Sequence, residues 1–127
     1  MAVQKALVLS AGGIRQLQTP DSVKHVGKKN LGGSTLTIAS GVITVTTSYH
    51  IIDTEGAGAS DDLVTINGGV DGDIVMFSAA HDARSIVFKT TGNIITGLGD
   101  ATLDTDKDVF IFRKHNNSWI FVGIENN

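Results

Sequence analysis

The sequence predicts an all-β protein, with a jelly-roll-like β-sandwich body and an extended N-terminal arm. The 127 residues include fifteen glycines and one proline, a composition typical of short strands and tight turns. Apolar segments recur at intervals of roughly ten residues, with Gly, Asp and Asn between them, as in a sandwich or barrel. Leu36, Ile38, Ile43 and Val45 alternate with threonines, which is the pattern of half-buried strands.

The arm is predicted to span residues 1–33 and the body residues 34–127. Within the arm, residues 3–18 have the pattern of a small hairpin that turns at two glycines. Residues 21–30 are polar and show no periodicity, so this segment has too little apolar surface to pack alone and is expected to be extended until a partner holds it. Residues 31–34, Leu-Gly-Gly-Ser, are predicted to be a hinge between the two parts.

Charge is distributed unevenly between these two parts. Up to Asn30 the chain has a single acidic residue and five basic ones, Lys5, Arg15, Lys24, Lys28 and Lys29. The remainder has five basic and twelve acidic residues. Such asymmetry suggests that the two parts face different partners. One arginine without any aromatic residue does not favour a nucleic-acid arm, so no nucleic-acid partner is predicted.

The absence of cysteine excludes disulfides and cysteine-based zinc sites, and it fits folding in a reducing cytoplasm. The longest N-terminal apolar block, residues 6–9, is too short for a secretory signal. No apolar segment approaches the length that crosses a membrane. We therefore expect a protein made in the cytoplasm, with no membrane partner.

Turn residues divide the body into short strands. The predicted strands are residues 35–38, 42–47, 49–54, 63–66, 73–77, 85–89 and 93–96. Residues 55–62 are expected to form a flexible loop, and residues 78–84 are the one helix candidate. The variable length of the turns favours the sandwich. A tubular stack of β coils would also show apolar strands separated by turns, so that alternative stays open.

The last twenty or so residues are predicted to form a β-hairpin. Two apolar, β-branched and aromatic segments flank Asn116-Asn117, and asparagine tolerates the positive φ of a two-residue primed turn. On one face this register pairs Lys114 with Trp119, Phe112 with Phe121 and Phe110 with Gly123. On the other face it pairs Arg113 with Ile120, Ile111 with Val122 and Val109 with Ile124.

The predicted hairpin is apolar on both faces, although a half-exposed antiparallel hairpin should alternate apolar with polar residues. A domain of this length has material for about one core, so one face is left for another subunit. Leaving several large apolar side chains exposed would create a patch prone to aggregation. We therefore predict an oligomer, with these interface residues: Phe110, Phe112, Trp119, Phe121 and Val122.

No pattern predicts catalysis, and no cofactor is expected. The four histidines, His25, His50, His81 and His115, lie in no catalytic motif, and neither a nucleophile elbow nor a P-loop is present. Asp104, Asp106 and Asp108 have the spacing that opens a calcium loop. The glycine and glutamate that should follow are replaced by Val109 and His115, so these carboxylates are expected to line a strand, and no metal site is predicted.

Two aromatic residues, Trp119 and Tyr49, are candidates for stacking on a sugar ring. Trp119 lies beside the predicted turn, where it either caps the core or meets a ligand or a subunit. Asp61, Asp62, Asp71 and Asp73 are predicted to be turn formers.

Several segments of the body resemble virion proteins of tailed bacteriophages. They are Gly-Val-Ile-Thr-Val at 41–45, Tyr-His-Ile-Ile-Asp-Thr-Glu-Gly at 49–56, Asp-Asp-Leu-Val-Thr-Ile-Asn-Gly-Gly at 61–69, Asp-Gly-Asp-Ile-Val at 71–75 and Asn-Asn-Ser-Trp at 116–119. The resemblance covers about residues 41–124 and consists of strands and turns. It is to the β-rich trimeric ends of tail fibres and to capsid decoration, or cement, proteins.

The resemblance implies a structural protein of the capsid surface rather than an enzyme. A compact β body with a basic arm and no long shaft is more similar to a cement protein, whose partner is the major capsid protein. On this hypothesis the five basic arm residues bind the capsid, and trimers clamp the shell against internal DNA pressure. The alternative is a receptor-binding tail-fibre or spike module that recognises host glycan through Trp119, Tyr49 and the acidic loops. A small glycan-cleaving enzyme is a third, weaker alternative.

Overall fold

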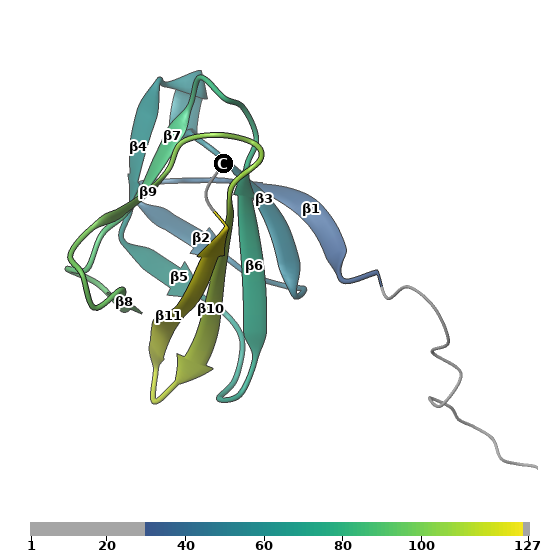
Figure 1. Ribbon diagram of the computed structural model, residues 1–127, viewed down its shortest axis with the longest axis vertical. Coiled ribbons are helices and arrows are strands. Elements are labelled where there is room, and N and C mark those ends of the chain that lie inside the picture. The colour runs from purple at the N-terminus through teal and green to yellow at the C-terminus, as the bar shows by residue number, and fades with distance from the viewer. Residues whose placement is uncertain (1–29, 126–127) are drawn as a thin grey trace, which may run out of the picture. The chain divides into compact units, whose positions relative to one another are not determined.

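The computed structural model describes residues 30–125, and within them the chain is all-β, as predicted. A 3₁₀ turn, Glu55–Ala57, interrupts the succession of strands. The strands are β1 (Gly32–Thr37), β2 (Val42–Thr44), β3 (Tyr49–Asp53), β4 (Ser60–Leu63), β5 (Thr65–Asn67), β6 (Ile74–Ala79), β7 (Ser85–Phe88), β8 (Ile94–Ile95), β9 (Ala101–Leu103), β10 (Val109–His115) and β11 (Ser118–Glu125) (Figure 1). No helix in this part of the chain is long and apolar enough to cross a membrane.

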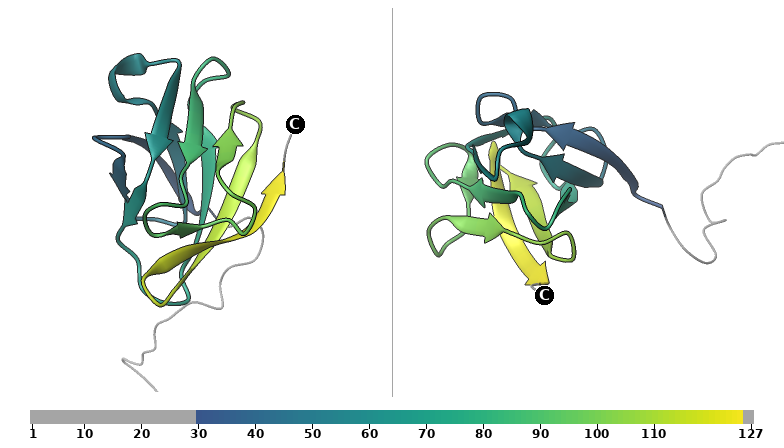
Figure 2. Two further views of the ribbon diagram at one scale, coloured as in Figure 1. Left: turned by 90° about the vertical axis from the view of Figure 1, so that its left-hand side faces the viewer. Right: turned by 90° about the horizontal axis from the view of Figure 1, so that it is seen from above.

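The strands form three sheets, of six, two and three strands. The largest has the order β1-β3-β6-β10-β11-β8, and the smaller ones are β2-β5 and β4-β7-β9 (Figure 2). Five of the eight pairings between these strands are parallel and three are antiparallel. A jelly roll is built from antiparallel strands. The mostly parallel strand pairing therefore differs from the pairing that the sandwich prediction implies.

Parallel pairing arises because the chain returns to each sheet in the same direction. In the six-stranded sheet β1, β3 and β6 run parallel as neighbours. In the smaller sheets β5 runs parallel to β2, and β7 runs parallel to β4. The antiparallel pairings β10–β6 and β10–β11 place the C-terminal hairpin beside β6 in the large sheet.

The sheets enclose one apolar core. Phe88 from β7 lies between the rings of Phe110 and Phe112 on β10, with centroid distances of 5.2 Å to each. Phe77 on β6 packs against Phe88 and Phe112 at 5.8 and 5.9 Å. All four rings are fully buried, and pairs of this geometry add about 0.5–1.5 kcal/mol each to the energy of burial. This cluster joins the three-stranded sheet to one face of the large sheet.

Asn93 fastens the loop before β8 to β5. Its Oδ1 accepts a hydrogen bond from the Ile66 N–H at 3.0 Å, and its Nδ2 donates to the Ile66 carbonyl at 2.8 Å. The indole Nε1 of Trp119 donates to the same carbonyl at 3.1 Å. The neighbouring Gly92 approaches Val64 so closely that a Cβ would lie 2.0 Å from the Val64 carbonyl oxygen. These contacts satisfy the buried N–H and carbonyl of Ile66 on β5, whose strand neighbour among the described residues is β2.

The hairpin register is confirmed near the turn. Lys114 pairs with Trp119, Arg113 with Ile120 and Phe112 with Phe121. Both turn asparagines have positive φ, 52° at Asn116 and 65° at Asn117. Beyond Phe112 the prediction is wrong by one residue, because a β-bulge shifts the ladder. Ile111 there pairs with Gly123, Phe110 with Ile124 and Val109 with Glu125.

Three other local predictions are also corrected. Residues 78–84 form no helix, because the Ala80 N–H donates to the Ile52 carbonyl at 2.9 Å and keeps the chain extended beyond β6. Residues 55–62, predicted to be a flexible loop, contain the 3₁₀ turn and most of β4. Gly32 and Gly33 are strand residues of β1 rather than a hinge, and the compact body begins at Leu31.

Candidate functional site

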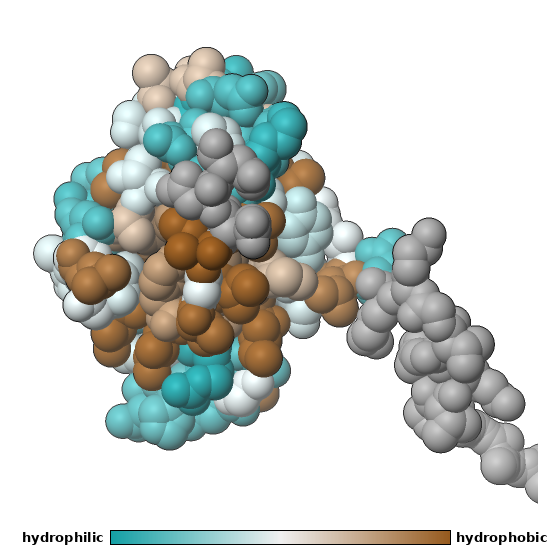
Figure 3. All heavy atoms as spheres, in the orientation of Figure 1, coloured by the Kyte–Doolittle hydropathy of each residue, from teal (hydrophilic) through white to brown (hydrophobic). Residues whose placement is uncertain are grey.

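The most distinctive surface of the body is the face of the large sheet that lies opposite the aromatic core. We call it the outer face and define it by six residues of β6, β10 and β11: Ile74, Met76, Ile111, Arg113, Ile120 and Val122. Ile74 is 51% exposed and Val122 is 59% exposed, and three of the others are half-buried. Figure 3 shows apolar side chains gathered over these strands, with hydrophilic residues beyond them toward the hairpin turn.

Strand periodicity places these residues together. Ile111 pairs with Met76 on one side and Arg113 pairs with Ile74, so alternate residues of β6 and β10 share the outer face. On β11, Ile120 pairs with Arg113. The bulge sets both Val122 and Gly123 against Ile111, which keeps Val122 on this face. The chain thus presents isoleucine and valine on the side of the hairpin that its own core does not cover.

The predicted subunit interface is corrected by this arrangement. Phe110, Phe112 and Trp119 are fully buried in the core of the chain itself, so their side chains offer no surface to a second subunit. Phe121 packs partly against the same core. Of the five residues only Val122 lies on the outer face. Because both faces of the hairpin are apolar, the sequence alone could not decide which of them the core would cover.

Sequence reasoning therefore missed most of the outer face, although part of the signal was present. Ile111 and Ile120 alternate with the buried phenylalanines, and the predicted register already placed them together on the opposite face of the hairpin. Ile74 gave no such signal, because Ile-Val-Met-Phe at the start of β6 is apolar at every position. The five basic residues predicted to bind a partner, Lys5, Arg15, Lys24, Lys28 and Lys29, lie outside the described residues.

Trp119 caps the edge of the core and is not available to a sugar. It is fully buried, and the Lys114 ammonium lies 5.5 Å from the centroid of its ring. That ammonium also donates to the Gly68 carbonyl at 2.7 Å. Tyr49 is half-buried on β3. The two predicted sugar-stacking residues therefore do not form one platform.

His50 acts as a buried polar link between β1, β3 and the segment that joins β2 to β3. Its Nε2 accepts hydrogen bonds from the backbone N–H groups of Thr46 and Thr47 at 3.0 and 3.2 Å. These two acceptor contacts place its proton on Nδ1, which donates to the Ser34 carbonyl at 3.0 Å. Both ring nitrogens are thus engaged within the chain. His81 and His115 are exposed, and His25 lies outside the described part.

The three aspartates with calcium-loop spacing do not converge on one point. Asp108 is fully buried, while Asp104 and Asp106 are exposed. Asp106 forms an ion pair with Lys107, and its N–H donates to Asp82 Oδ1 at 2.9 Å. This Lys107 ammonium holds the pKa of Asp106 below its ordinary value. Among residues 30–124 no group of three or more His, Asp or Glu side chains is placed to hold a metal ion.

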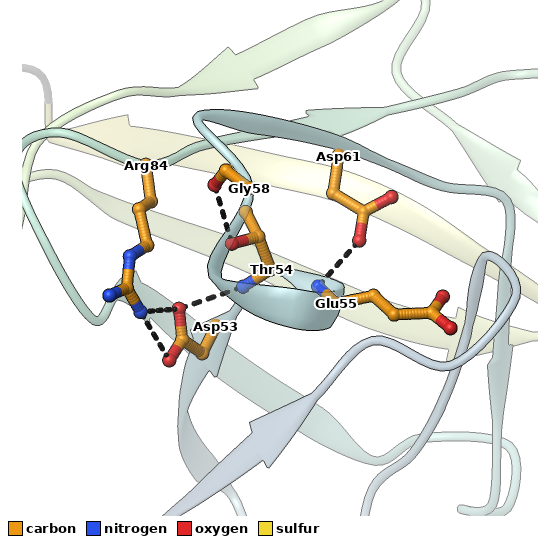
Figure 4. A network of polar contacts seen from close by, with 6 residues as sticks. All are labelled: Asp53, Thr54, Glu55, Gly58, Asp61 and Arg84. Carbon is orange, nitrogen blue, oxygen red and sulfur yellow. Dashed lines mark hydrogen bonds and ion pairs between the residues drawn. The ribbon is translucent and has the colours of Figure 1, made fainter.

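A polar network fixes the corner between β3 and β4 (Figure 4). Arg84 Nη1 donates to both carboxylate oxygens of Asp53, at 2.8 and 2.9 Å. This guanidinium lowers the pKa of Asp53 from its ordinary value. Asp61 Oδ2 accepts from the Glu55 N–H at 2.7 Å, and Thr54 Oγ1 donates to the Gly58 carbonyl at 2.6 Å. Each of these side chains is engaged in holding the turn, so the network is structural.

A polar hollow lies between the β2–β3 connection and the start of β6. It has a volume of about 340 Å³, and the polar side chains of its lining are Thr46, Thr47, Ser48 and Asp73. Thr47 Oγ1 donates to the Tyr49 carbonyl at 2.9 Å, and Asp73 Oδ2 accepts from the Val70 N–H at 2.9 Å. The hollow has one carboxylate and no cationic side chain among its lining residues.

The chain matches no protein-family model, and a search of curated proteins finds no match.

Proposed function

We propose that this protein is a structural component of a bacteriophage virion, a capsid decoration protein that acts as a homotrimer on the capsid surface. The observation that carries the proposal is the outer face, an apolar sheet surface that the described residues of a single chain leave exposed. Exposed apolar patches of this kind mark interaction sites. The resemblance of the body segments to tailed-phage virion proteins supplies the setting, and the partner is the major capsid protein.

The parallel pairing of neighbouring strands supports a tubular body rather than a jelly roll. Parallel neighbours in all three sheets are what a chain wound in successive coils produces, and coils of this kind stack into rigid rods or short tubes. We propose that the body is a short stack of coils closed by the C-terminal hairpin. Such a scaffold suits a mechanical role, in which the protein clamps capsid subunits and catalyses no reaction.

The opposite charges of the acidic body and the basic arm suggest that the two parts contact different partners. The arm residues Lys24, Lys28 and Lys29 attach to the capsid, while the body joins the copies to one another. Each exposed ion pair contributes only about 0–1 kcal/mol. Three arms that engage together raise the effective concentration of every contact, so the trimer binds far more tightly than one chain.

Binding to capsids that lack decoration tests the proposal. The full-length chain is expected to bind such capsids and to raise the temperature at which they break open. A variant with Lys24, Lys28 and Lys29 changed to Gln should bind more weakly, whereas the matched change of all three to Arg should bind like the unmodified chain. Equal binding by the Gln and Arg variants contradicts the role of the arm, and no binding by the unmodified chain contradicts the decoration role.

The alternative, a receptor-binding module for host glycan, draws support from the polar hollow. Hydroxyl and carboxylate groups above a buried valine floor are a suitable lining for a neutral sugar. Adhesion of the labelled protein to host cells, lost on changing Asp73 to Ala and absent from capsids, would establish this alternative in place of decoration.

A further inference from the structure

The sequence contains two places where glycine follows asparagine or aspartate, Asn67-Gly68 at the end of β5 and Asp71-Gly72 just before β6. Such pairs are chemically labile, because the backbone nitrogen of a residue without a side chain can approach the side-chain carbonyl carbon of the residue before it. Whether either pair reacts in the folded protein depends on how its atoms are held. The structure holds the two pairs in different ways.

Both reacting groups of Asp71-Gly72 are engaged. The Gly72 N–H donates to the Lys114 carbonyl at 2.9 Å, and Asp71 Oδ1 accepts from the Asn116 N–H at 2.9 Å. These bonds hold the nitrogen and the carboxylate in the turn, so neither is free to approach the other. An ionised carboxylate is also a poorer target for a nucleophile than an amide. This pair is therefore expected to be stable, and it provides an internal comparison.

The reacting groups of Asn67-Gly68 are not held in this way. Asn67 is exposed, and within the part of the chain that the structure describes neither its side-chain amide nor the Gly68 N–H forms a hydrogen bond. The Asn67 carbonyl accepts from the Val45 N–H at 2.9 Å, but this carbonyl is not the group that is attacked. Because Asn67 is the last residue of β5, the rotation that brings the Gly68 nitrogen to its side chain disturbs that bond and leaves the rest of the strand paired.

We propose that Asn67 is a site of spontaneous deamidation in the folded protein. The Gly68 nitrogen attacks Cγ of Asn67, the bond between them forms, the Cγ–Nδ2 bond breaks, and the amide nitrogen leaves as ammonia with the proton that Gly68 gives up. Water then opens the cyclic imide. Attack at the main-chain carbonyl gives isoaspartate, and attack at the side-chain carbonyl gives aspartate. Water is the sole co-reactant, and the reaction is independent of the proposed decoration role.

The surroundings of Gly68 give the isoaspartate product a structural consequence. A Cβ on Gly68 would lie 2.5 Å from the Val45 carbonyl oxygen, so the main chain passes Val45 closely. The Gly68 carbonyl accepts from Lys114 Nζ at 2.7 Å, and this ammonium lies 5.5 Å from the centroid of the Trp119 ring. Isoaspartate lengthens the main chain by one carbon immediately before Gly68. It should therefore displace the Gly68 carbonyl and loosen the edge of the core around Trp119.

Incubation of the folded full-length protein in mildly alkaline buffer tests the proposal, with peptide mapping by mass spectrometry to locate the change. Conversion is expected at Asn67 before it is seen at Asn93 or Asn117, with isoaspartate as the main product. Ion exchange separates the converted protein, because either product adds a negative charge. Its midpoint of thermal unfolding should lie about 4 °C or more below that of fresh protein, the scale on which a lost hydrogen bond affects a domain of this size.

Two variants separate the reaction from its consequence. Asn67→Gln keeps the amide but would have to close a larger ring, so its side chain should remain unchanged over the same period. Asn67→Asp, freshly prepared, has the added charge with a main chain of normal length, so it should keep most of the stability that the isoaspartate form loses. Because the Asn67 side chain is exposed and forms no hydrogen bond within the described residues, both variants are expected to fold. Circular dichroism verifies this.

The inference is overturned if Asn67 stays intact in the folded protein while it converts in urea, because the fold would then protect it. It is equally overturned if Asn117 reacts as fast as Asn67, or if Asn67→Gln loses its amide at the same rate as the unmodified chain. An isoaspartate form as stable as fresh protein would overturn the consequence assigned to the Gly68 backbone. Isomerisation of Asp71 at the rate of Asn67 would contradict the comparison between the two pairs.

Discussion

The two faces of the C-terminal hairpin have similar composition and opposite surroundings. On the inner face Phe110 and Phe112 are fully buried, because Phe88 of the three-stranded sheet packs on both rings at 5.2 Å. On the outer face Ile111 is half-buried and Val122 is 59% exposed, because no other strand of the described chain crosses over them. Apolar character therefore does not determine burial within a chain. Burial requires a second layer, and residues 30–125 supply one layer for two apolar faces.

The largest expected effect is on the inner face. Phe112→Ala removes a fully buried ring that touches Phe77, Phe88 and Phe121, and the cavity should lower the free energy of unfolding by about 3–5 kcal/mol. Urea denaturation followed by tryptophan fluorescence measures the change, since Trp119 is the only tryptophan. A loss below about 1 kcal/mol would mean that the inner face is no better packed than the outer one.

The next largest effect is expected from the buried hydrogen bonds between the Asn93 side chain and the backbone of Ile66. Asn93→Ala removes both side-chain hydrogen bonds to Ile66 and leaves a buried N–H without its acceptor, which should cost about 1–3 kcal/mol of unfolding free energy. Asn67→Ala, at an exposed position of the same strand, is the matched control and should change stability by less than about 0.5 kcal/mol. Equal effects of the two changes in thermal unfolding would contradict the role of Asn93.

A smaller loss of stability is expected at acid pH, from the Asp53–Arg84 ion pair, which belongs to neither face of the hairpin. The guanidinium of Arg84 lowers the pKa of Asp53, so the folded state binds this proton less readily than the unfolded chain. The stability that the pair contributes is fully present above the ordinary aspartate pKa of about 3.9, and it is lost as pH falls through the lower folded value. Because both side chains are partly exposed, we expect about 1 kcal/mol or less.

Asp53→Asn measures that contribution. Its free energy of unfolding should fall short of the unmodified chain at neutral pH, and the two should converge as pH falls through the lowered folded pKa of Asp53 and the carboxylate of the unmodified chain is protonated. A difference that stays constant from neutral to acid pH would show that Asp53 acts through its shape rather than its charge.

The smallest expected effect on folding is on the outer face. Ile111→Ser, next to Phe112 in the chain, should change the unfolding free energy of a single chain by no more than about 1 kcal/mol, because the side chain is only half-buried. The same change should weaken self-association, which sedimentation velocity detects. If it unfolds the chain as readily as Phe112→Ala does, the contrast between the two faces is wrong.

The local parts of this fold could be predicted from the sequence. Alternating threonines identified the first strands, and Asn116-Asn117 fixed the register as far as Phe112–Phe121. The register beyond that pair was not predictable, because the bulge at Val122 has no signal in an apolar segment. The parallel ladder was not predictable either, since pairings such as β4 with β7 depend on contacts remote in sequence.

The candidate site shows the same division. Alternation predicted that the hairpin would be apolar on both sides, and the exposed Val122 and half-buried Ile120 agree with it. Which side would face the core depended on where β7 brings Phe88, and nothing near residues 109–125 encodes that. The assignment of Phe110, Phe112 and Trp119 to a subunit interface failed for this reason.

The most direct test of the central claim, that sister copies cover the outer face, is the mass of the unmodified full-length protein by sedimentation equilibrium at micromolar concentration. The account predicts three chains per particle, with dissociation to single chains only on strong dilution or on placing a charge at Ile120. A particle of one chain that stays soluble across the whole concentration range would contradict it.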